Sequence, residues 1–258
     1  MAGPLQRFVY RIYERQLEQE LEGAVLPQHV GVILDGHRRY ARAEGLPDYA
    51  VSYRRGMEKL ETVIRWIAEF DIPVLTAWVL SPQNLSRPKE ELEPYFDVLI
   101  DLFERLPGLA DELDLRLRII GSLDLLPDDL VTAGKKMMEA RPDGHHTLNV
   151  ALAYGGREEI VDAARNLVAD LVQQGVDPMQ IPDQIDADRL AEHMYSAGQP
   201  DPDLLIRTSG ESRLSGFLLW HSTYAEFAFI DAYWPAFRRI DFLRSLRDYS
   251  LRERRYGR

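Results

Sequence analysis

The sequence predicts an α/β protein with a single domain over residues 1–258, built on a central, mainly parallel six-stranded sheet that is flanked by helices. Short apolar runs alternate with longer segments of helical periodicity, and most of the apolar runs stop at glycine or at charged residues. A chain of 258 residues that is 45% hydrophobic fits one medium-sized domain. Strands that alternate with helices are joined by right-handed crossovers, so their sheet should be mainly parallel.

Residues 1–26 are expected to form an amphipathic helix, because apolar and charged positions alternate there at helical spacing. The acidic side chains of this helix argue against binding to anionic lipid. No apolar run of the sequence approaches the ~20 residues that cross a bilayer. We therefore expect at most a peripheral contact with a membrane.

Six apolar runs have the composition of strands. They lie at residues 29–34, 74–80, 115–121 and 146–153, in a short run that ends at Arg207, and in a run that passes through Trp220. Helical spacing predicts helices at about residues 52–70, 88–106, 127–140 and 158–174. The polar segment 175–199 should form a lid-like or peripheral connection with one short helix near Arg189.

Local signals fix the boundaries of these elements. Pro73 ends the first long helix and restarts the chain as a strand. Pro88 precedes a turn rich in lysine and glutamate, which is typical of a helix start. Gly121 ends the third strand, and the pair Gly155 and Gly156 stops the fourth.

Charge and motifs exclude several classes of function. The net charge of −11 disfavours nucleic-acid binding, so an anionic ligand must be held by local clusters of arginine. The chain has no cysteine, which excludes disulfides and is compatible with the cytoplasmic location that we expect. P-loop, dinucleotide-binding, HExxH and α/β-hydrolase motifs do not occur in the sequence. The pair His145 and His146 opens a strand, where a structural role is favoured over a zinc site.

The end of the first strand carries the first candidate site. The stretch HVGVILDGHRRY ends an apolar run at Asp35 and Gly36 and continues into Arg38 and Arg39. A carboxylate can hold a hard cation, glycine lets backbone amides approach a phosphate, and arginines bind phosphate oxygens in a fork. This inventory suits a metal-bound diphosphate. The alternative is an ordinary strand-to-helix turn with a surface pair of arginines.

Asn84 and Gly155 also follow strand ends, as Asp35 does. Ligands of parallel sheets bind beyond the carboxyl ends of the strands, so these residues should share one rim. Glu226 stands in an apolar context, where its carboxylate needs a partner. A cation shared with Asp35 would supply that partner.

Arg207, Arg213 and Ser215 form a second candidate cluster around a Ser-Gly turn. Two arginines on either side of such a turn can converge on one phosphate, and the serine adds a hydroxyl donor. The alternative is a solvated loop whose arginines pair with Glu211.

These motifs together make the chain similar to the cis-prenyltransferases, the family that contains undecaprenyl diphosphate synthase and short-chain Z-farnesyl diphosphate synthases. The resemblance runs from about residue 29 to residue 257 and is carried by HVGVILDG-x-x-R, S-x-x-N-x-x-R-P, LRIIG, LNVALAYGGR-x-E-I, DLLIRTSGE-x-R-x-S-x-FLLW, YAEF, WPAF and ERRYG. It implies a hydrophobic tunnel, two prenyl diphosphate substrates, and a reaction in which an allylic diphosphate ionises and the double bond of the second unit attacks.

The resemblance also implies roles for individual residues. Asp35 and Glu226 would bind Mg²⁺, and Asp35, His37, Arg39 and Asn84 would take part in catalysis. The implied substrate-binding residues are Gly36, Arg38, Arg39, Tyr40, Arg87, Val79, Leu80, Arg207, Arg213, Ser215, Arg255 and Gly257.

The family resemblance implies a homodimer in which the C-terminal residues 255–257 reach the phosphate site of the partner. Several positions depart from the family pattern. His37, Arg38 and Tyr40 stand where the family usually has Asn, Gly and Trp, and Tyr53 replaces a histidine. We hypothesise that His37 takes a proton near neutral pH and sets where the carbocation is deprotonated.

These departures leave two reactions open. One is the Mg²⁺-dependent addition of isopentenyl diphosphate to dimethylallyl, geranyl or farnesyl diphosphate, by an enzyme whose tunnel is closed early by Trp78, Val79 and Leu80. The other is irregular coupling of two allylic diphosphates to a branched, lavandulyl-type product. A non-catalytic partner subunit of a homologous synthase is a third alternative.

Overall fold

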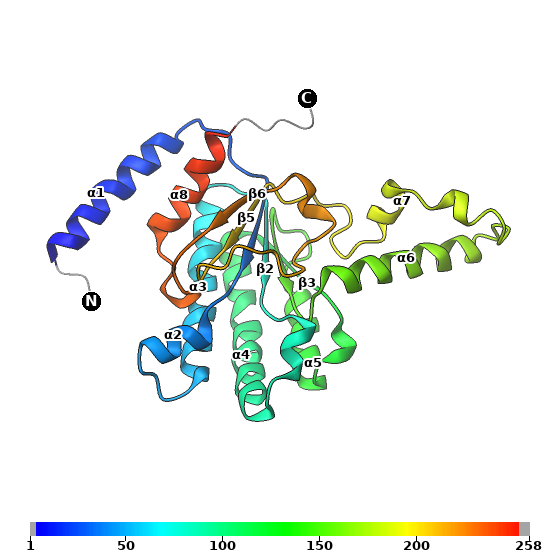
Figure 1. Cartoon of the computed structure of the whole chain (residues 1–258), viewed down its shortest axis with the longest axis horizontal. Helices are drawn as coiled ribbons and strands as arrows, with labels where there is room; N and C mark the ends of the chain where they lie inside the picture. Colours follow the sequence, from blue (N-terminus) through cyan, green and yellow to red (C-terminus); the bar gives the residue numbers. More distant parts are fainter. Residues whose placement is uncertain (1–3, 253–258) are drawn as a thin grey trace.

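The computed structural model describes residues 4–252, and its centre is one sheet of six strands (Figure 1). The strands are β1 (His29–Ile33), β2 (Val74–Trp78), β3 (Leu115–Ile120), β4 (His146–Ala151), β5 (Leu204–Arg207) and β6 (Glu226–Phe229). Their order across the sheet is β3-β4-β2-β1-β5-β6, and every neighbouring pair is parallel. The predicted α/β class with a six-stranded central sheet is confirmed, and the sheet is parallel throughout.

Helices surround the sheet, and most of them match predicted segments. They are α1 (Pro4–Leu21), α2 (His37–Ala43), α3 (Tyr49–Glu69), α4 (Lys89–Leu113), α5 (Asp128–Met138), α6 (Gly156–Gln173), α7 (Ala187–Glu192) and α8 (Arg239–Ser250). Helices α2 and α8 lie outside the predicted set. No helix in the described part of the chain combines the length and the apolar character that a bilayer crossing needs.

The two faces of the sheet have different partners, because successive strand residues point to opposite sides. Val32 and Ala77 belong to the larger core, which joins the sheet to α3 and α4. On the opposite face, Ile33 and Trp78 belong to a second buried cluster that includes Phe217. The rings of Trp78 and Phe217 stack there, with centroids 5.2 Å apart and planes 9° apart.

The apolar run through Trp220 is not a strand, and that part of the prediction is wrong. Ser215 and Leu218 have φ angles of 53° and 47°, which no strand residue adopts. Phe217 and Leu218 are instead buried under the second face of the sheet. The apolar character of this run therefore reflects burial and not strand pairing. The sixth strand begins further along, at Glu226, and pairs with β5.

The carboxyl ends of three strands lie together at one edge. Ile33 at the end of β1 is opposite Trp78 of β2 and opposite Arg207 of β5. The segments that leave these strands start side by side, which brings together residues far apart in the sequence. This edge positions the candidate site.

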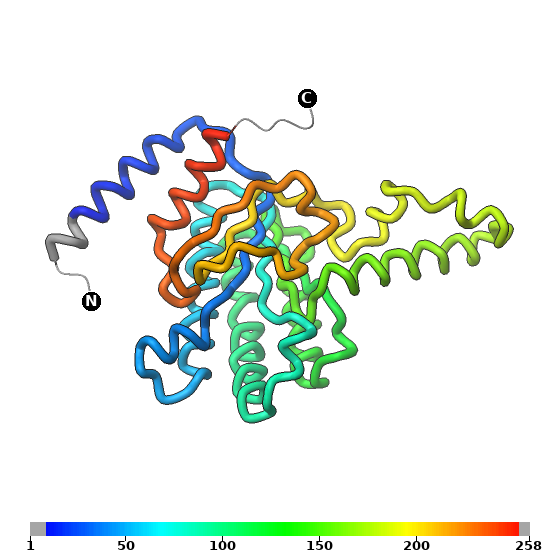
Figure 2. Tube along the Cα trace, viewed as in Figure 1, coloured from blue at the N-terminus to red at the C-terminus, as the bar shows by residue number. Residues whose placement is uncertain are grey.

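Two parts of the chain extend away from the body. Helix α6 projects as an arm, and the segment that contains α7 returns along it (Figure 2). The returning segment is the peripheral connection predicted for residues 175–199, and α7 is its short helix near Arg189. At the other side of the molecule, α1 packs against α8, so segments from the two ends of the chain lie side by side (Figure 1).

Candidate active site

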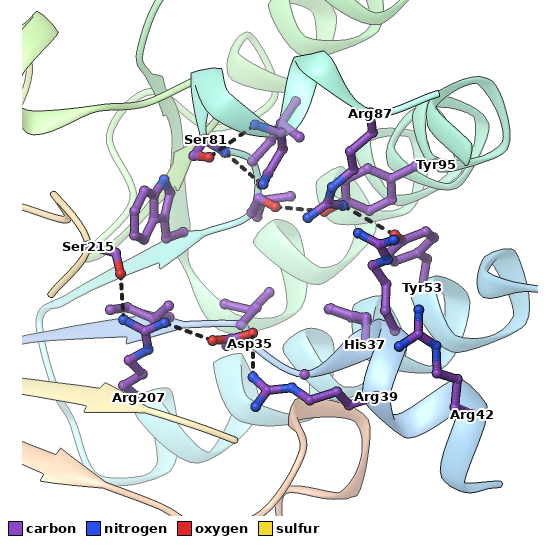
Figure 3. A pocket seen from close by; sticks show the side chains of 18 residues that line it. Asp35, His37, Arg39, Arg42, Tyr53, Ser81, Arg87, Tyr95, Arg207 and Ser215 are labelled. Carbon is purple, nitrogen blue, oxygen red and sulfur yellow. Dashed lines mark hydrogen bonds and ion pairs between the residues drawn. The ribbon is translucent and has the colours of Figure 1, made fainter. Parts of the chain in front are cut away.

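A pocket of about 520 Å³ lies beyond the carboxyl ends of β1, β2 and β5 (Figure 3). Polar groups come from the β1–α2 turn, from the segment after β2 and from β5. Apolar groups come from the ends of β1 and β2. The residues that line it are Ile33, Leu34, Asp35, Gly36, His37, Arg38, Arg39, Arg42, Tyr53, Trp78, Val79, Leu80, Ser81, Asn84, Arg87, Tyr95, Arg207 and Ser215.

Asp35 stands between two arginines in this pocket (Figure 3). Nη2 of Arg207 donates to Oδ2 of Asp35 at 2.8 Å, and Nη2 of Arg39 donates to Oδ1 at 3.3 Å. Burial would raise the pKa of Asp35, but the hydrogen bond and charge of Arg207 and the charge of Arg39 outweigh burial and lower that pKa. The carboxylate is therefore ionised at neutral pH.

The backbone around Asp35 is fixed by its neighbours. The Thr208 hydroxyl donates to the Asp35 carbonyl oxygen at 2.8 Å, and the Trp234 amide donates to the same oxygen at 2.9 Å. Gly36, which precedes α2, has a φ of 105°, and a Cβ there would lie 2.8 Å from the Tyr233 ring. Only glycine fits both the left-handed backbone and this close approach. The turn that aims Asp35 and Arg39 therefore depends on Gly36.

Arg207 is the most buried guanidinium of the pocket, with 7% of its side chain exposed. Its Nη1 donates to the Ser215 hydroxyl at 2.8 Å and to the backbone carbonyl of Arg213. Its Nε has no hydrogen-bond partner among the described residues. Arg39 also donates to the Ser209 hydroxyl, at 2.6 Å, and to Glu211, at 3.1 Å. The two arginines that flank Asp35 are thus both held by the loop that follows β5.

A second group of basic side chains is organised by Glu91, whose side chain is only 9% exposed. Tyr53 donates its hydroxyl proton to Glu91 at 2.6 Å. Nη1 of Arg87 lies 3.4 Å and Nε of Arg38 lies 3.6 Å from the same carboxylate. Arg87 also donates to the Tyr53 hydroxyl at 3.2 Å. Burial first, and then this bond to Glu91, raise the pKa of Tyr53, so Tyr53 stays protonated.

The role of Glu91 was not predicted from the sequence. The acidic first turn after Pro88 is sufficiently explained as a helix start, and nothing in the local sequence indicates that one of its carboxylates binds the distant Arg38 as well as the neighbouring Arg87. Arg42, Ser81 and Tyr95 also line the pocket without having been predicted. The Ser-x-x-Asn spacing does carry a signal for Ser81, because Ser81 and Asn84 cap the short 3₁₀ turn reciprocally.

His37 lines the pocket, but the premise that it titrates near neutral pH is wrong. Its ring packs against Gly56, where a Cβ would overlap the imidazole, and lies 5.2 Å from the Tyr53 ring. Nδ1 is 3.3 Å from the Ser52 carbonyl oxygen, so Nδ1 carries the proton. Burial lowers the pKa of His37 to about 4. His37 is therefore neutral at pH 7, and its Nε2 has no partner among the described residues.

Glu226 does not meet Asp35, so the prediction of a cation shared by these two carboxylates within one chain is wrong. Glu226 is opposite Leu204, and Leu204 is opposite Val30, at the start of the strands. Asp35 follows the other end of β1. By strand geometry the two carboxylates are separated by at least about 10 Å along the sheet and about 10 Å across it. Glu226 forms an ion pair with Arg252 instead.

Two predicted substrate-binding side chains are not among those that line the pocket. The Arg213 side chain is 66% exposed and pairs with Glu211 at 2.5 Å, as the alternative interpretation of that loop expected. The Tyr40 hydroxyl accepts a hydrogen bond from Arg55 at 3.1 Å. Arg255 and Gly257 lie outside the described residues. The other predicted substrate-binding side chains do line the pocket.

The fold and the pocket define a class of enzyme. A parallel α/β sheet carries, beyond its strand ends, a pocket in which guanidinium groups surround one carboxylate and an apolar wall adjoins them. Guanidinium groups bind phosphate oxygens, and the apolar wall suits a hydrocarbon tail. The class is that of enzymes acting on phosphorylated apolar substrates.

Comparisons with known proteins identify the family within this class. The family model described as "Putative undecaprenyl diphosphate synthase" matches residues 33–257. The chain is 47% identical to a (2Z,6E)-farnesyl diphosphate synthase of Thermobifida fusca, covering 99% of each protein. It is 45% identical to isoprenyl transferase 1 of Corynebacterium diphtheriae, covering 96% of this chain and 93% of that protein.

A solved structure gives the same result. The chain resembles lavandulyl diphosphate synthase from Lavandula x intermedia, in complex with dimethylallyl diphosphate, with a TM-score of 0.84 and 34% identity over 90% of this chain and 99% of that one. The chain belongs to the cis-prenyltransferase family. The prediction of a prenyltransferase is confirmed.

Proposed function

We propose that this chain is a short-chain prenyl diphosphate synthase, which condenses a short allylic diphosphate with a five-carbon prenyl diphosphate and releases pyrophosphate. The observation that carries this proposal is the position of Asp35. Its ionised carboxylate lies between Arg39 and Arg207, and the apolar residues Trp78 and Val79 line the same pocket. The arginines therefore suit a charged diphosphate, and the apolar residues suit a hydrocarbon chain.

The arginines supply the chemistry for departure of the diphosphate. Loss of pyrophosphate from an allylic carbon moves negative charge onto the leaving oxygens, and preorganised guanidinium groups stabilise that charge. Arg38, Arg39, Arg87 and Arg207 all line the pocket, so two diphosphate groups have donors available on separate sides. Glu91 holds Arg38 and Arg87 together, and Asp35 holds Arg39 and Arg207.

The residues present fit Mg²⁺, which we propose as the cofactor. Mg²⁺ is usually bound by one or two carboxylates together with substrate phosphates. Asp35 is the single carboxylate among the described residues that line the pocket, and the lowered pKa keeps it ionised. Asp35 would hold the ion with oxygens of the diphosphate, and the ion would add positive charge at the leaving group.

The apolar wall of the pocket supports a short hydrocarbon chain. Trp78, Val79 and Leu80 line the pocket, and Phe217 stacks on the Trp78 ring with centroids 5.2 Å apart. A bulky indole held in place at this wall leaves less room for a long chain than a small side chain would, which favours a short substrate.

Irregular coupling of two allylic diphosphates to a branched product is the second candidate function. Two observations favour carrying it forward: His37 stands where the family has Asn, and the chain shares its fold and 34% identity with a lavandulyl diphosphate synthase. The Thermobifida relative, named as a farnesyl diphosphate synthase, supports regular coupling instead.

We also propose that the active species is a homodimer, in which residues 255–257 of one subunit reach the phosphate site of the other. Strand β6 is one of the two edge strands of the sheet. Tyr224, which precedes it, and Phe229, its last residue, are exposed. An exposed apolar edge of this kind suits a second copy of the chain. A mass measurement in solution, and mixing of Arg255→Ala with Asp35→Asn subunits, test this: restored activity in the mixture requires sharing of sites between subunits.

The experiment that tests the function supplies the purified chain with dimethylallyl, geranyl or farnesyl diphosphate and Mg²⁺, with and without isopentenyl diphosphate. Products are identified by mass spectrometry after dephosphorylation, and pyrophosphate release is followed in parallel. Regular coupling predicts product only when isopentenyl diphosphate is present, whereas irregular coupling predicts a branched product from dimethylallyl diphosphate alone. Absence of pyrophosphate release in every mixture would support the non-catalytic subunit and refute the proposal.

A further inference from the structure

A cluster of possible metal ligands lies at the end of the sheet opposite the pocket. Asp71, His145 and His146 bring their ligand atoms within 4.8 Å of one another. Asp71 precedes β2, and His146 is the first residue of β4, which pairs with β2. Because the pocket lies beyond the other ends of these parallel strands, the cluster is separate from the candidate active site.

The two distances from Asp71 to the imidazoles are close to those of a zinc site. Oδ1 of Asp71 lies 3.5 Å from Nε2 of His145 and 3.7 Å from Nε2 of His146. Tetrahedral zinc with ligands at about 2.0–2.1 Å separates neighbouring ligand atoms by about 3.3–3.4 Å. Both carboxylate–imidazole separations are within about 0.4 Å of that value. His145 has 65% of its side chain exposed, so a small rotation of this ring can complete the geometry.

His146 is already oriented as a ligand. Its Nδ1 lies 3.0 Å from the backbone carbonyl oxygen of Ile72, so Nδ1 donates its proton there and Nε2 is the ring nitrogen left for a metal. Nε2 is the atom that faces Asp71. A metal-binding histidine is usually held in position by a hydrogen bond from the ring nitrogen that does not bind the metal. Only 10% of the His146 side chain is exposed, which restricts the ring to this position.

Asp71 adds a carboxylate at a backbone position that suits glycine better. Its φ is 51°, in the left-handed region, directly after the end of α3. Its side chain is 81% exposed and faces both imidazoles. The sequence favours a structural role for the histidine pair, because the pair opens a strand. Asp71 is more than 70 residues away along the chain, and only the pairing of β2 with β4 brings it close.

We propose that Asp71, His145 and His146 bind a divalent transition metal, of which Zn²⁺ fits best, with water as the fourth ligand. Two imidazoles and one carboxylate favour zinc over magnesium, which prefers oxygen ligands alone. The ion ties the chain that enters β2 to the start of β4. The site is independent of the proposed prenyl transfer, because none of its ligands lines the pocket.

The test uses the full-length, tag-free chain after treatment with a chelator, in an Asp35→Asn background that removes the carboxylate of the pocket. Zn²⁺ is titrated by calorimetry, and Co²⁺ is titrated by visible absorption, which reports tetrahedral coordination. We expect one equivalent to bind, a tetrahedral Co²⁺ spectrum, and a rise in the melting temperature with Zn²⁺ concentration. If neither Zn²⁺ nor Co²⁺ binds at millimolar concentration, the proposal is overturned.

Three variants in the same background locate the site. His145→Ala and Asp71→Gly alter exposed side chains. Asp71→Gly also removes the conformational strain of a non-glycine residue in the left-handed region. Without metal, both variants should therefore melt at or above the melting temperature of the parent. Each should bind Zn²⁺ at least about tenfold more weakly than the parent. His193→Ala is the matched control, because His193 pairs with Asp170 at 2.9 Å outside the cluster. Equal affinity in all three variants places the metal elsewhere and refutes the proposal.

Discussion

The buried imidazole of His37 makes a quantitative prediction about acid stability. Its pKa is lowered by burial from 6.5 to about 4 in the folded chain. The unfolded chain therefore binds more protons than the folded chain between these two values, and stability falls as the pH falls through this window. The full loss below pH 4 is about 3.4 kcal/mol, and at about pH 5 it is already about 2 kcal/mol.

Replacing His37 with Gln removes this titration while keeping a polar side chain of similar size. We expect the loss of unfolding free energy between about pH 7.5 and about pH 5 to be smaller in the variant by about 2 kcal/mol. Urea denaturation at the two pH values measures it, and the comparison of differences cancels any packing defect that is independent of pH. His29, whose pKa burial also lowers to about 4, contributes equally to both proteins.

The same state of His37 bears on the reaction. A neutral imidazole at pH 7 predicts that the activity profile shows no ionisation near pH 6.5 from this group. His193→Gln serves as a control of opposite sign for the denaturation measurement. Hydrogen bonds to the Arg189 carbonyl and to Asp170 raise the pKa of His193, so this histidine stabilises the fold more at low pH, and its replacement should not reduce the loss of unfolding free energy on acidification. An identical pH dependence of stability in the wild type and in His37→Gln would falsify the argument from burial.

Three further outcomes are expected. Asp35→Asn should lower the rate of pyrophosphate release at least about 100-fold. It should also reduce the unfolding free energy by about 1–3 kcal/mol, because buried Arg207 loses a charged partner. An unchanged rate would show that Asp35 has no part in the reaction. Glu91→Gln should lower kcat/KM about tenfold in a steady-state assay, because it releases two arginines of the pocket. Glu112→Gln, at an exposed glutamate outside the pocket, should leave kcat/KM unchanged. Equal effects of the two substitutions would contradict a role of Glu91 in positioning these arginines. Trp78→Ala should lengthen the product seen by mass spectrometry and destabilise the fold by about 3–5 kcal/mol, and an unchanged product would show that Trp78 does not limit chain length.

Much of the site could be predicted from sequence because parallel sheets have a simple rule. Polar residues placed just after buried strands, such as Asp35 and Asn84, meet at one edge whatever the details of packing. Arg207, which ends β5, follows from the same rule. The prediction for Glu226 was wrong because the apolar run through Trp220 is not a strand. Glu226 instead begins β6, at the end of the sheet away from Asp35.

The sequence by itself determined the α/β class, the parallel sheet and the residues at the strand ends, because hydrophobic periodicity and chain breaks are local properties. The tertiary structure alone decided the neutral state of His37, the contact of Glu91 with two arginines, and the meeting of Asp71 with His145 and His146. These depend on burial and on strand order between distant segments. Neither quantity is encoded in any single stretch of the chain.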